Sequence, residues 1–200
     1  MNFAPAFNYW LYGFDDPALG SQQTFRAILE AMDNPGRLVT IRENLYTPEV
    51  FNLASAATCL TLLDYETTVW TDVDRNSPVI NWLQFCCGGS VVTEPCMANF
   101  TIITKPATMP ALDYFRIGQN EYPGNVTTMV VQVDDILPAK DDRYSSIFAD
   151  KATQLELKGI TDNFWRQWQQ LSNLHPSGID IFFTCDDVLM SFPIIKQIEY

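Results

Sequence analysis

The single histidine of this chain is the first residue to consider for proton transfer near neutral pH. His175 precedes Pro176, between a predicted helix and a predicted strand, and loops beside a sheet often carry functional side chains. Proton transfer would also require an orienting partner nearby. A structural role is the simpler interpretation of a lone histidine, and both roles stay open.

Two arginines near the N-terminus are candidates for anion binding. Arg26 lies beside Phe25 on a predicted helix, so its stem is expected to be half-buried while its guanidinium binds a carboxylate or a phosphate oxygen. A structural ion pair is the simpler alternative. Arg37 follows Pro35 and Gly36 and could cap the last carbonyls of the same helix.

Acidic residues occur as adjacent pairs along the chain. Neighbouring residues on an extended chain point to opposite sides, so such pairs seldom form an acid–base couple. Turns and helix caps are their expected roles. The pairs are Asp15–Asp16, Asp134–Asp135, Asp141–Asp142 and Asp186–Asp187.

The cysteines lack the paired Cys-x-x-Cys or Cys/His spacing of a zinc site. Their odd number favours free thiols, which are usually buried. The adjacent Cys86 and Cys87 could form a nucleophilic thiol, but they follow a predicted helix whose dipole opposes a thiolate. We therefore expect structural thiols and no metal site. The cysteines are Cys59, Cys86, Cys87, Cys96 and Cys185.

Common catalytic motifs are missing from the sequence. It contains no Gly-x-Ser-x-Gly elbow, no phosphate loop ending in Lys-Ser/Thr and no Gly-x-Gly-x-x-Gly fingerprint. The residues alone therefore predict no self-sufficient active site.

The composition limits the classes of partner. A net charge of −12 without a basic run disfavours nucleic-acid binding. No stretch approaches the roughly 18 apolar residues of a membrane span, and the first basic residue is Arg26, so no export signal is predicted. We expect a cytoplasmic protein with neither a membrane nor a nucleic acid as partner.

The arginines depend on the first predicted helix for their position. Asp16 can cap this helix with Pro17 in its first turn, and Pro35–Gly36 ends it. Its apolar residues recur with helical spacing and predict the buried face. They are Phe25, Ile28, Leu29 and Met32.

The other predicted elements alternate between helices and strands. Helices are expected to begin at Thr47–Glu49, Ser77 and Thr161, the last burying Phe164, Trp165, Trp168 and Leu171, with a short helix at 111–115. Residues 134–150 are predicted to form a loop. Strands are predicted at 38–41, 67–71, 91–92, 100–103, 126–133, 155–157, 179–184 and 189–192, the last two joined by a turn at 186–187.

This order of elements predicts an α/β domain in which helices cover a mixed sheet. With 47% hydrophobic residues, the 200-residue chain suits one domain, residues 1–200. Residues 1–13 are aromatic and are expected to form an arm that packs on the domain or on a partner.

Three stretches, taken together, resemble one known family. The first comprises Asp16–Pro17 and residues 22–36, the second runs from Leu60 through Trp70, and the third covers His175 to Asp180. Their order and spacing, from residue 14 to about residue 198, resemble the PhnH family, the H subunit of the bacterial carbon–phosphorus lyase system.

The chain departs from the family pattern at three places. Cys86 and Cys87 replace the central residues of a usual Phe-His-Thr-Gly, and Lys158-Gly159-Ile160 replaces a Gly-Pro-Gly-Ile turn. Ile194 stands where the family has the arginine of Pro-Arg-Thr-Thr. Any anion site built from those polar groups is altered here.

The resemblance implies a three-layer α/β/α fold similar to the large domain of pyridoxal-phosphate (PLP) transferases, but without that cofactor. It also implies a homodimer that joins the G, I and J subunits. With G, I and L, the family is linked to forming ribose 1-phosphonate 5-triphosphate from ATP and an alkylphosphonate, with loss of adenine.

Two functional hypotheses follow. In the first, the chain is a non-autonomous subunit of ribose 1-methylphosphonate 5-triphosphate synthase, without a cofactor of its own. In the second, it is a scaffolding or ligand-binding module that holds ATP or a phosphonate, with Arg26, Arg37, His175 and Asp180 as ligand-binding residues. The net charge of −12 opposes anion binding and weighs against the second hypothesis.

Overall fold

The computed structural model describes residues 13–116, 127–138, 155–174 and 179–192. Among these residues, no helix is long and apolar enough to cross a membrane. His175, Ile194 and the predicted arm, apart from residue 13, lie outside the described residues.

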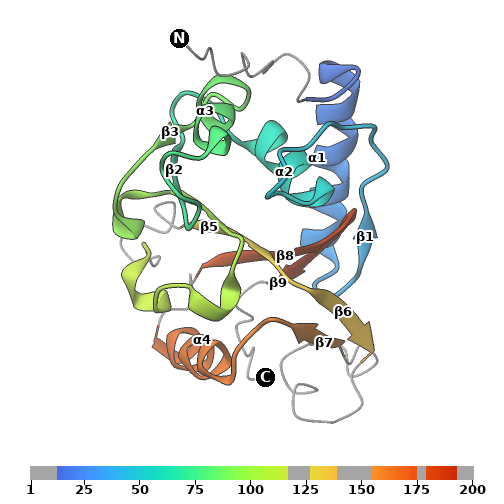
Figure 1. Ribbon diagram of the computed structural model, residues 1–200. Coiled ribbons are helices and arrows are strands. Elements are labelled where there is room, and N and C mark those ends of the chain that lie inside the picture. Colours follow the sequence, from blue (N-terminus) through green and yellow to red (C-terminus); the bar gives the residue numbers. More distant parts are fainter. Residues whose placement is uncertain (1–12, 117–126, 139–154, 175–178, 193–200) are drawn as a thin grey trace.

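A seven-stranded sheet forms the centre of the domain (Figure 1), in the order β1-β9-β8-β5-β4-β2-β3. Five adjacent strands run parallel to one another, in the order β3, β2, β4, β5 and β8. The two remaining pairs, β8–β9 and β9–β1, are antiparallel. The mixed sheet predicted from the sequence is therefore confirmed. The strands are β1 (Val39–Thr40), β2 (Thr68–Thr71), β3 (Ser90–Val91), β4 (Phe100–Ile103), β5 (Thr128–Gln132), β8 (Asp180–Cys185) and β9 (Val188–Phe192).

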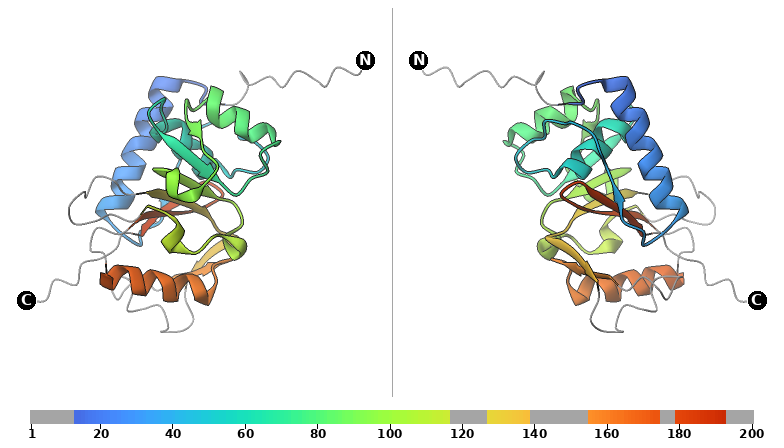
Figure 2. Two further views of the ribbon diagram at one scale, coloured as in Figure 1. Left: turned by 90° about the vertical axis from the view of Figure 1, so that its left-hand side faces the viewer. Right: turned by 90° about the vertical axis from the view of Figure 1, so that its right-hand side faces the viewer.

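Helices cover both faces of this sheet (Figure 2). On one face, α1 (Pro17–Asp33), α2 (Leu53–Leu62) and α3 (Pro78–Phe85) enclose one apolar core. On the other face, α4 (Asp162–Leu174) encloses a second core. Successive side chains of a strand point to opposite faces of the sheet and so enter different cores. In β5, Val130 belongs to the first core, and Met129 and Val131 belong to the second.

Short elements complete the fold. A separate hairpin pairs β6 (Asp135–Pro138) with β7 (Leu155–Lys158). The acidic stretch after residue 133 was predicted to be a loop, and this is wrong for β6, whose Ile136 packs against the second core. The described residues contain three 3-10 helices, η2 (Pro95–Met97), η3 (Pro106–Thr108) and η4 (Leu112–Tyr114), the last at the predicted short helix.

Helix α1 begins and ends as predicted, but its buried face is different. The Asp16 carboxylate accepts hydrogen bonds from the backbone N–H groups of Ala18 and Leu19. Of the four residues predicted to be buried, only Ile28 is, at 2% exposure. Phe25, Leu29 and Met32 are 46%, 43% and 44% exposed.

Small residues explain this rotation of α1. The residues that face the core are Gly20, Thr24, Ile28 and Ala31. The Phe14 ring lies so close that a Cβ atom on Gly20 would approach it to 2.6 Å. Because the small side chains allow the helix to lie against α2 and β9, the large apolar side chains of Phe25, Leu29 and Met32 remain on an outer flank.

Helix α2 starts later than predicted. Asn52 is its N-cap and accepts a hydrogen bond from the Ser55 N–H at 2.8 Å, while the Asn52 N–H donates to Oε1 of Gln132 at 2.7 Å. Val50, predicted to lie on the buried stripe, is outside the helix and 41% exposed. The long-range contact with Gln132 on β5 fixes this start, and local sequence does not reveal it.

The C-terminal predictions are confirmed. Phe164, Trp165, Trp168 and Leu171 of α4 are 4–8% exposed. Strands β8 and β9 are joined at Asp186, whose φ of 49° places it in the left-handed region that tight turns use. Helix α3 also begins as predicted, with the Ser77 hydroxyl accepting from the Val79 N–H.

Candidate functional site

A groove runs between α1 and the edge strand β1, with a volume of about 470 Å³. Its helical wall includes Arg26 and its strand wall includes Arg37, so the structure brings together two of the predicted ligand-binding residues. It adds a third arginine, Arg42. The remaining lining residues are Gln23, Thr24, Ala27, Glu30, Leu38, Val39, Thr40, Ile41 and Glu43.

The groove is lined by three arginines and two glutamates, Glu30 and Glu43, so its net charge is +1 on a protein whose net charge is −12. The Nη2 atom of Arg37 lies 3.3 Å from Oε1 of Glu30, and both side chains are well exposed, so this ion pair contributes little to stability. Within the described residues, neither Arg26 nor Arg42 makes a hydrogen bond or an ion pair. Two guanidinium groups are thus available to an anionic group from outside.

A buried hydroxyl lies in the helical wall of the same groove. Thr24 is 1% exposed, and its Oγ1 atom has no hydrogen-bond partner within the described structure. A buried polar atom without a partner is uncommon. Sequence reasoning missed both Thr24 and Arg42. In an extended segment, successive side chains point to opposite sides. Val39 and Ile41 are buried, so this rule could have placed Arg42 on the outer face.

The other two predicted ligand-binding residues are not assembled with the arginines. His175 lies outside the described residues. Asp180 opens β8 and does not line the groove. It is exposed, yet partial desolvation of its carboxyl group raises its pKa above the ordinary value. The structure therefore unites Arg26 with Arg37 but not with Asp180.

The carboxyl ends of the parallel strands are the usual ligand site in this class of fold. Here Asp72, after β2, reaches across to the end of β4. Its carboxylate accepts hydrogen bonds from the N–H and hydroxyl of Thr104 at 2.8 and 3.0 Å, and from the N–H of Lys105 at 2.8 Å. These contacts make Asp72 a link between two strands.

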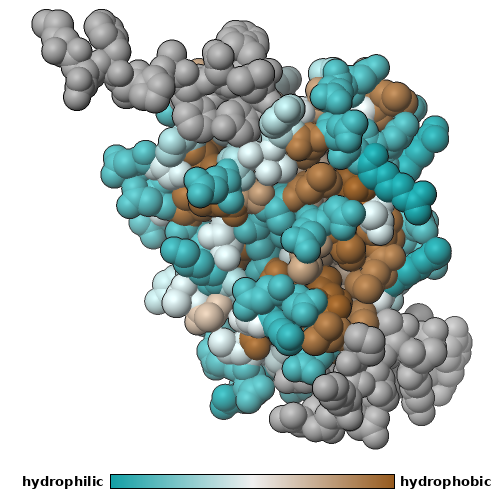
Figure 3. Space-filling view, turned by 45° about the vertical axis from the view of Figure 1, so that its right-hand side comes forward, coloured by the Kyte–Doolittle hydropathy of each residue, from teal (hydrophilic) through white to brown (hydrophobic). Residues whose placement is uncertain are grey.

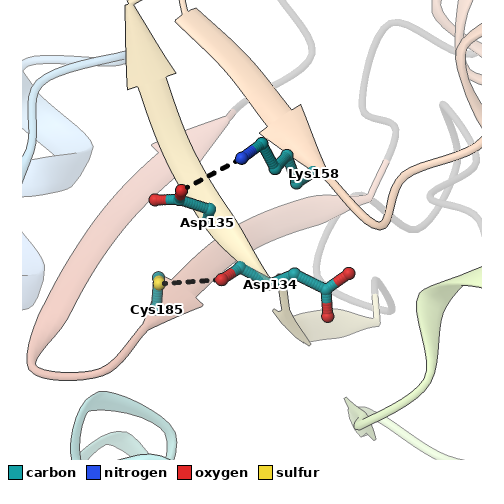
Figure 4. Close-up of polar contacts among 4 residues, drawn as sticks. All are labelled: Asp134, Asp135, Lys158 and Cys185. Atoms are coloured by element: carbon teal, nitrogen blue, oxygen red, sulfur yellow. Dashed lines mark hydrogen bonds and ion pairs between the residues drawn. The ribbon is translucent and has the colours of Figure 1, made fainter.

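The neighbouring strand ends are acidic (Figure 4). The Lys158 ammonium lies 3.4 Å from Oδ2 of Asp135, and the Cys185 thiol donates to the carbonyl oxygen of Asp134 at 3.8 Å. Desolvation, followed by the charges of nearby aspartates, raises the pKa of Cys185. The described residues contain no cluster of three side chains that could hold a metal ion. This edge therefore disfavours anions, in contrast to the groove.

The remaining thiols do not support nucleophilic catalysis. Burial raises the pKa of Cys59, Cys86 and Cys87, and Cys86 is the C-cap of α3. A reactive cysteine requires the opposite shift. All five cysteines are free, as predicted, but Cys96 is exposed and not buried. Cys96 is the central residue of the short helix η2, where the neighbouring Met97 is also exposed.

Comparison with known proteins adds a relationship across almost the whole chain. A family model described as "Bacterial phosphonate metabolism protein (PhnH)" matches residues 12–199. A relative from Rhizobium meliloti (strain 1021), "Alpha-D-ribose 1-methylphosphonate 5-triphosphate synthase subunit PhnH", is 27% identical over 187 residues. That alignment covers 93% of this chain and 94% of the relative.

Proposed function

The chain belongs to the PhnH family of bacterial phosphonate metabolism proteins, and on this premise we propose that it is a subunit of a ribose 1-methylphosphonate 5-triphosphate synthase. The observation that carries the proposal is the alignment with the Rhizobium meliloti subunit, which covers 94% of that protein.

We also propose that the chain has the partners that the family resemblance implies. The chain would join the G, I and J subunits, pair with a second copy of itself and work in the cytoplasm with the L subunit. The complex would join an alkylphosphonate to the ribose of ATP with loss of adenine. Exposed apolar side chains on α1 support a role in assembly, since such groups often mark contacts with other proteins.

The proposed architecture is that of the large domain of PLP transferases, used without the cofactor. Two described lysines are in keeping with this. Lys158 pairs with Asp135 on the β6–β7 hairpin, where both side chains are exposed, and Lys105 follows β4, where its backbone N–H donates to the Asp72 carboxylate. Neither lysine lines the groove between α1 and β1.

Reconstitution tests the main proposal. The tagged chain is co-expressed with candidate G, I and J subunits and weighed by native mass spectrometry, and release of adenine from ATP and methylphosphonate is then measured with and without this chain. A stable complex and a dependence of adenine release on this chain are expected. A chain that ignores the other subunits, or that turns over ATP and methylphosphonate alone, would contradict the proposal.

A second role is favoured by the arginines in the groove between α1 and β1. We propose that Arg26, Arg37 and Arg42 bind a phosphate, phosphonate or carboxylate group. Their convergence beside the unpartnered hydroxyl of Thr24 supports this, whereas the net charge of −12 opposes it.

Calorimetric titration with ATP and with methylphosphonate tests this second role. Arg26→Ala should weaken binding about tenfold, as expected for loss of one charge-assisted hydrogen bond. The matched control is Arg166→Ala, because Arg166 lies on α4 at the opposite face of the sheet. Absence of heat with both ligands, or equal effects of the two substitutions, would exclude a free anion site.

A further inference from the structure

Strand β1 lies at one edge of the seven-stranded sheet and pairs with β9 on its inner side. Val39 lies opposite Leu189, and the Ile41 N–H donates to the carbonyl oxygen of Asp187 at 2.8 Å. In an antiparallel pair, residues that bond to the partner strand alternate with residues whose N–H and C=O groups point away from it. The residues with outward-pointing backbone groups are Leu38, Thr40 and Arg42.

The outer side of β1 is open in the part of the chain that the structure describes. No hydrogen bond there uses the outward N–H and C=O groups of Leu38, Thr40 and Arg42, and all three residues are exposed. Such a row of unpaired groups is a template for a further strand. Residues 38–42 contain neither lysine nor proline, two residues that often protect an edge strand. The edge is therefore suited to pairing with another extended chain.

The groove between α1 and β1 lies along this open edge. Its strand side comprises every residue from Arg37 to Glu43, and its other side is formed by α1. A strand added at the usual spacing of about 4.8 Å from β1 would lie in this groove. Residues 38–42 span about 13 Å, which matches a segment of about five residues.

Apolar surface accompanies the groove. Figure 3 shows hydrophobic side chains gathered in a band on the side of the molecule that carries α1 and β1. Leu38 lines the groove and is 43% exposed. Because side chains alternate along a strand, an added segment can cover apolar surface with one set of side chains and present polar groups with the other.

Charge favours an acidic segment. Arg26 and Arg42 make no hydrogen bond or ion pair among the described residues, and the groove carries a net charge of +1. The Debye length is about 8 Å at physiological ionic strength, so these nearby charges act on a bound segment more than the remote acidic groups do. The buried hydroxyl of Thr24 in the same wall has no partner and can donate to a carboxylate or carbonyl oxygen.

Other occupants fit these observations less well. A free phosphate or phosphonate would pair with the arginines but leave the backbone groups of β1 unpaired. A second copy of β1 would pair with those groups but bring the arginines of two grooves together, and like charges on adjacent strands are destabilising. An acidic extended segment satisfies both the backbone groups and the arginines.

We propose that this edge of the sheet binds an extended acidic segment of another protein, which adds a strand to β1 and places a carboxylate against Arg26. In this mode of recognition, the main-chain hydrogen bonds give affinity and the side chains at alternate positions give specificity. The inference deepens the second role proposed above and rests on it, because it names the molecule that supplies the anionic group.

Peptide titration tests the charge requirement. The probe is a blocked peptide in which Glu and Val alternate, and its control is the same peptide with Lys in place of Glu. Calorimetry should detect binding of the Glu peptide alone. Arg26→Ala should weaken that binding about tenfold, whereas Arg166→Ala on α4 should leave it unchanged. Equal binding of both peptides, or no binding of the Glu peptide at millimolar concentration, would overturn the inference.

Backbone pairing is tested separately from charge. N-methylation of alternate residues removes every N–H group from one edge of the Glu peptide, so only one of the two possible N-methylated peptides should still bind. Hydrogen exchange measured by NMR should show slower exchange of the Thr40 and Arg42 amides in the complex. Equal effects of the two N-methylation patterns, or unchanged exchange, would mean that the peptide is held by charge alone and would contradict strand addition.

A substitution in β1 examines the same contact from the protein side. Thr40→Pro removes one outward N–H and is compatible with an edge strand, so it should weaken peptide binding at least about tenfold. Val91→Pro on β3 is the matched control. Ser90 and Val92 donate to residues of the β2 segment, so the Val91 N–H points away from β2 at the opposite edge of the sheet. Equal weakening by both substitutions would count against β1, and the N-methylated peptides decide the question if Thr40→Pro unfolds the protein.

Comparison with methylphosphonate distinguishes this inference from the roles proposed above. If methylphosphonate binds and requires Arg26 while the Glu peptide does not bind, the groove is a small-anion site, the second role stands and the inference is wrong. If the Glu peptide binds and methylphosphonate does not, the inference holds with a carboxylate as the anionic group. Assembly with the G, I and J subunits is measured independently by native mass spectrometry.

Discussion

Helices α1 and α4 lie on opposite faces of one sheet and use their apolar residues in opposite ways. Helix α4 buries its large side chains, with Trp165 and Trp168 at 8% and 7% exposure. Helix α1 buries small residues such as Gly20 and Ala31 and leaves Phe25 nearly half exposed. The same apolar periodicity thus serves the core in one helix and an outer surface in the other.

The largest loss of stability is expected from truncating a buried aromatic side chain of α4. The Trp165 ring packs against Phe164, Phe183 and Phe192, with ring centroids 5.2, 6.2 and 5.4 Å away. Trp165→Ala should lower the free energy of unfolding by about 3–5 kcal/mol, because it leaves a cavity in the second core. Urea denaturation measures this, and Arg166→Ala should change it by less than about 0.5 kcal/mol. A loss below about 1 kcal/mol would contradict the packing of α4.

The small-residue contact of α1 should give the next largest effect. A Cβ atom on Gly20 would lie 2.6 Å from the Phe14 ring, so Gly20→Ala should cost about 1–2 kcal/mol despite the better helix propensity of alanine. Gly13→Ala is the control, since nothing lies within 4 Å of its added Cβ. Thermal unfolding compares the two variants. Combining Gly20→Ala with Phe14→Ala should be less harmful than the sum of both changes, and simple additivity would count against the contact.

Truncating the outer flank of α1 should affect folding less. Met32 is 44% exposed, so Met32→Ser should change the free energy of unfolding of the monomer by less than about 1 kcal/mol. Denaturation at low protein concentration measures this value, and sedimentation at higher concentration should show weaker pairing. A loss as large as that of Trp165→Ala would place Met32 in the core and remove the contrast between the helices.

The smallest effect concerns a carboxylate beyond the end of α2. The hydroxyl of Thr67 donates to Oδ1 of Asp64 at 2.7 Å, and this hydrogen bond, assisted by the N–H of Glu66, lowers the Asp64 pKa. A lowered carboxyl pKa stabilises the folded state at pH values above the usual pKa of about 3.9. This stabilisation is lost as the pH falls through the pKa of the folded state. Thr67→Val should therefore lower the urea midpoint at pH 7 but hardly at pH 2. A difference that persists at pH 2 would assign the effect to packing.

Local signals were sufficient where neighbouring residues determine structure. The cap at Asp16, the proline at the start of α3 and the turn at Asp186 were predicted correctly. The exposed side of α1 was not, because apolar periodicity shows that a helix has an apolar face without showing how close its neighbours approach. The position of Gly20 against Phe14 decides that, and it follows from tertiary packing.

The candidate site likewise contains residues that local sequence could bring together and residues that only tertiary packing places. Arg26 and Arg37 are close in sequence and flank one turn, so their meeting in one groove was within reach of sequence reasoning. Asp180 is remote in sequence, and the family-like segment that suggested it gives no information on its distance from α1. Thr24 carried no signal, since a threonine within a helix does not reveal that its hydroxyl is buried without a partner.

The pairing of β1 with β9 also sets an order of events during synthesis. Val39 lies opposite Leu189, so the β1–β9 edge of the sheet that α1 covers is completed about 150 residues after β1 leaves the ribosome. At 5–20 residues per second, this delay is on the order of 10 s. Throughout that interval, the buried side of α1 has α2 beside it but lacks β9, so the nascent N-terminal half exposes apolar surface that a chaperone can bind.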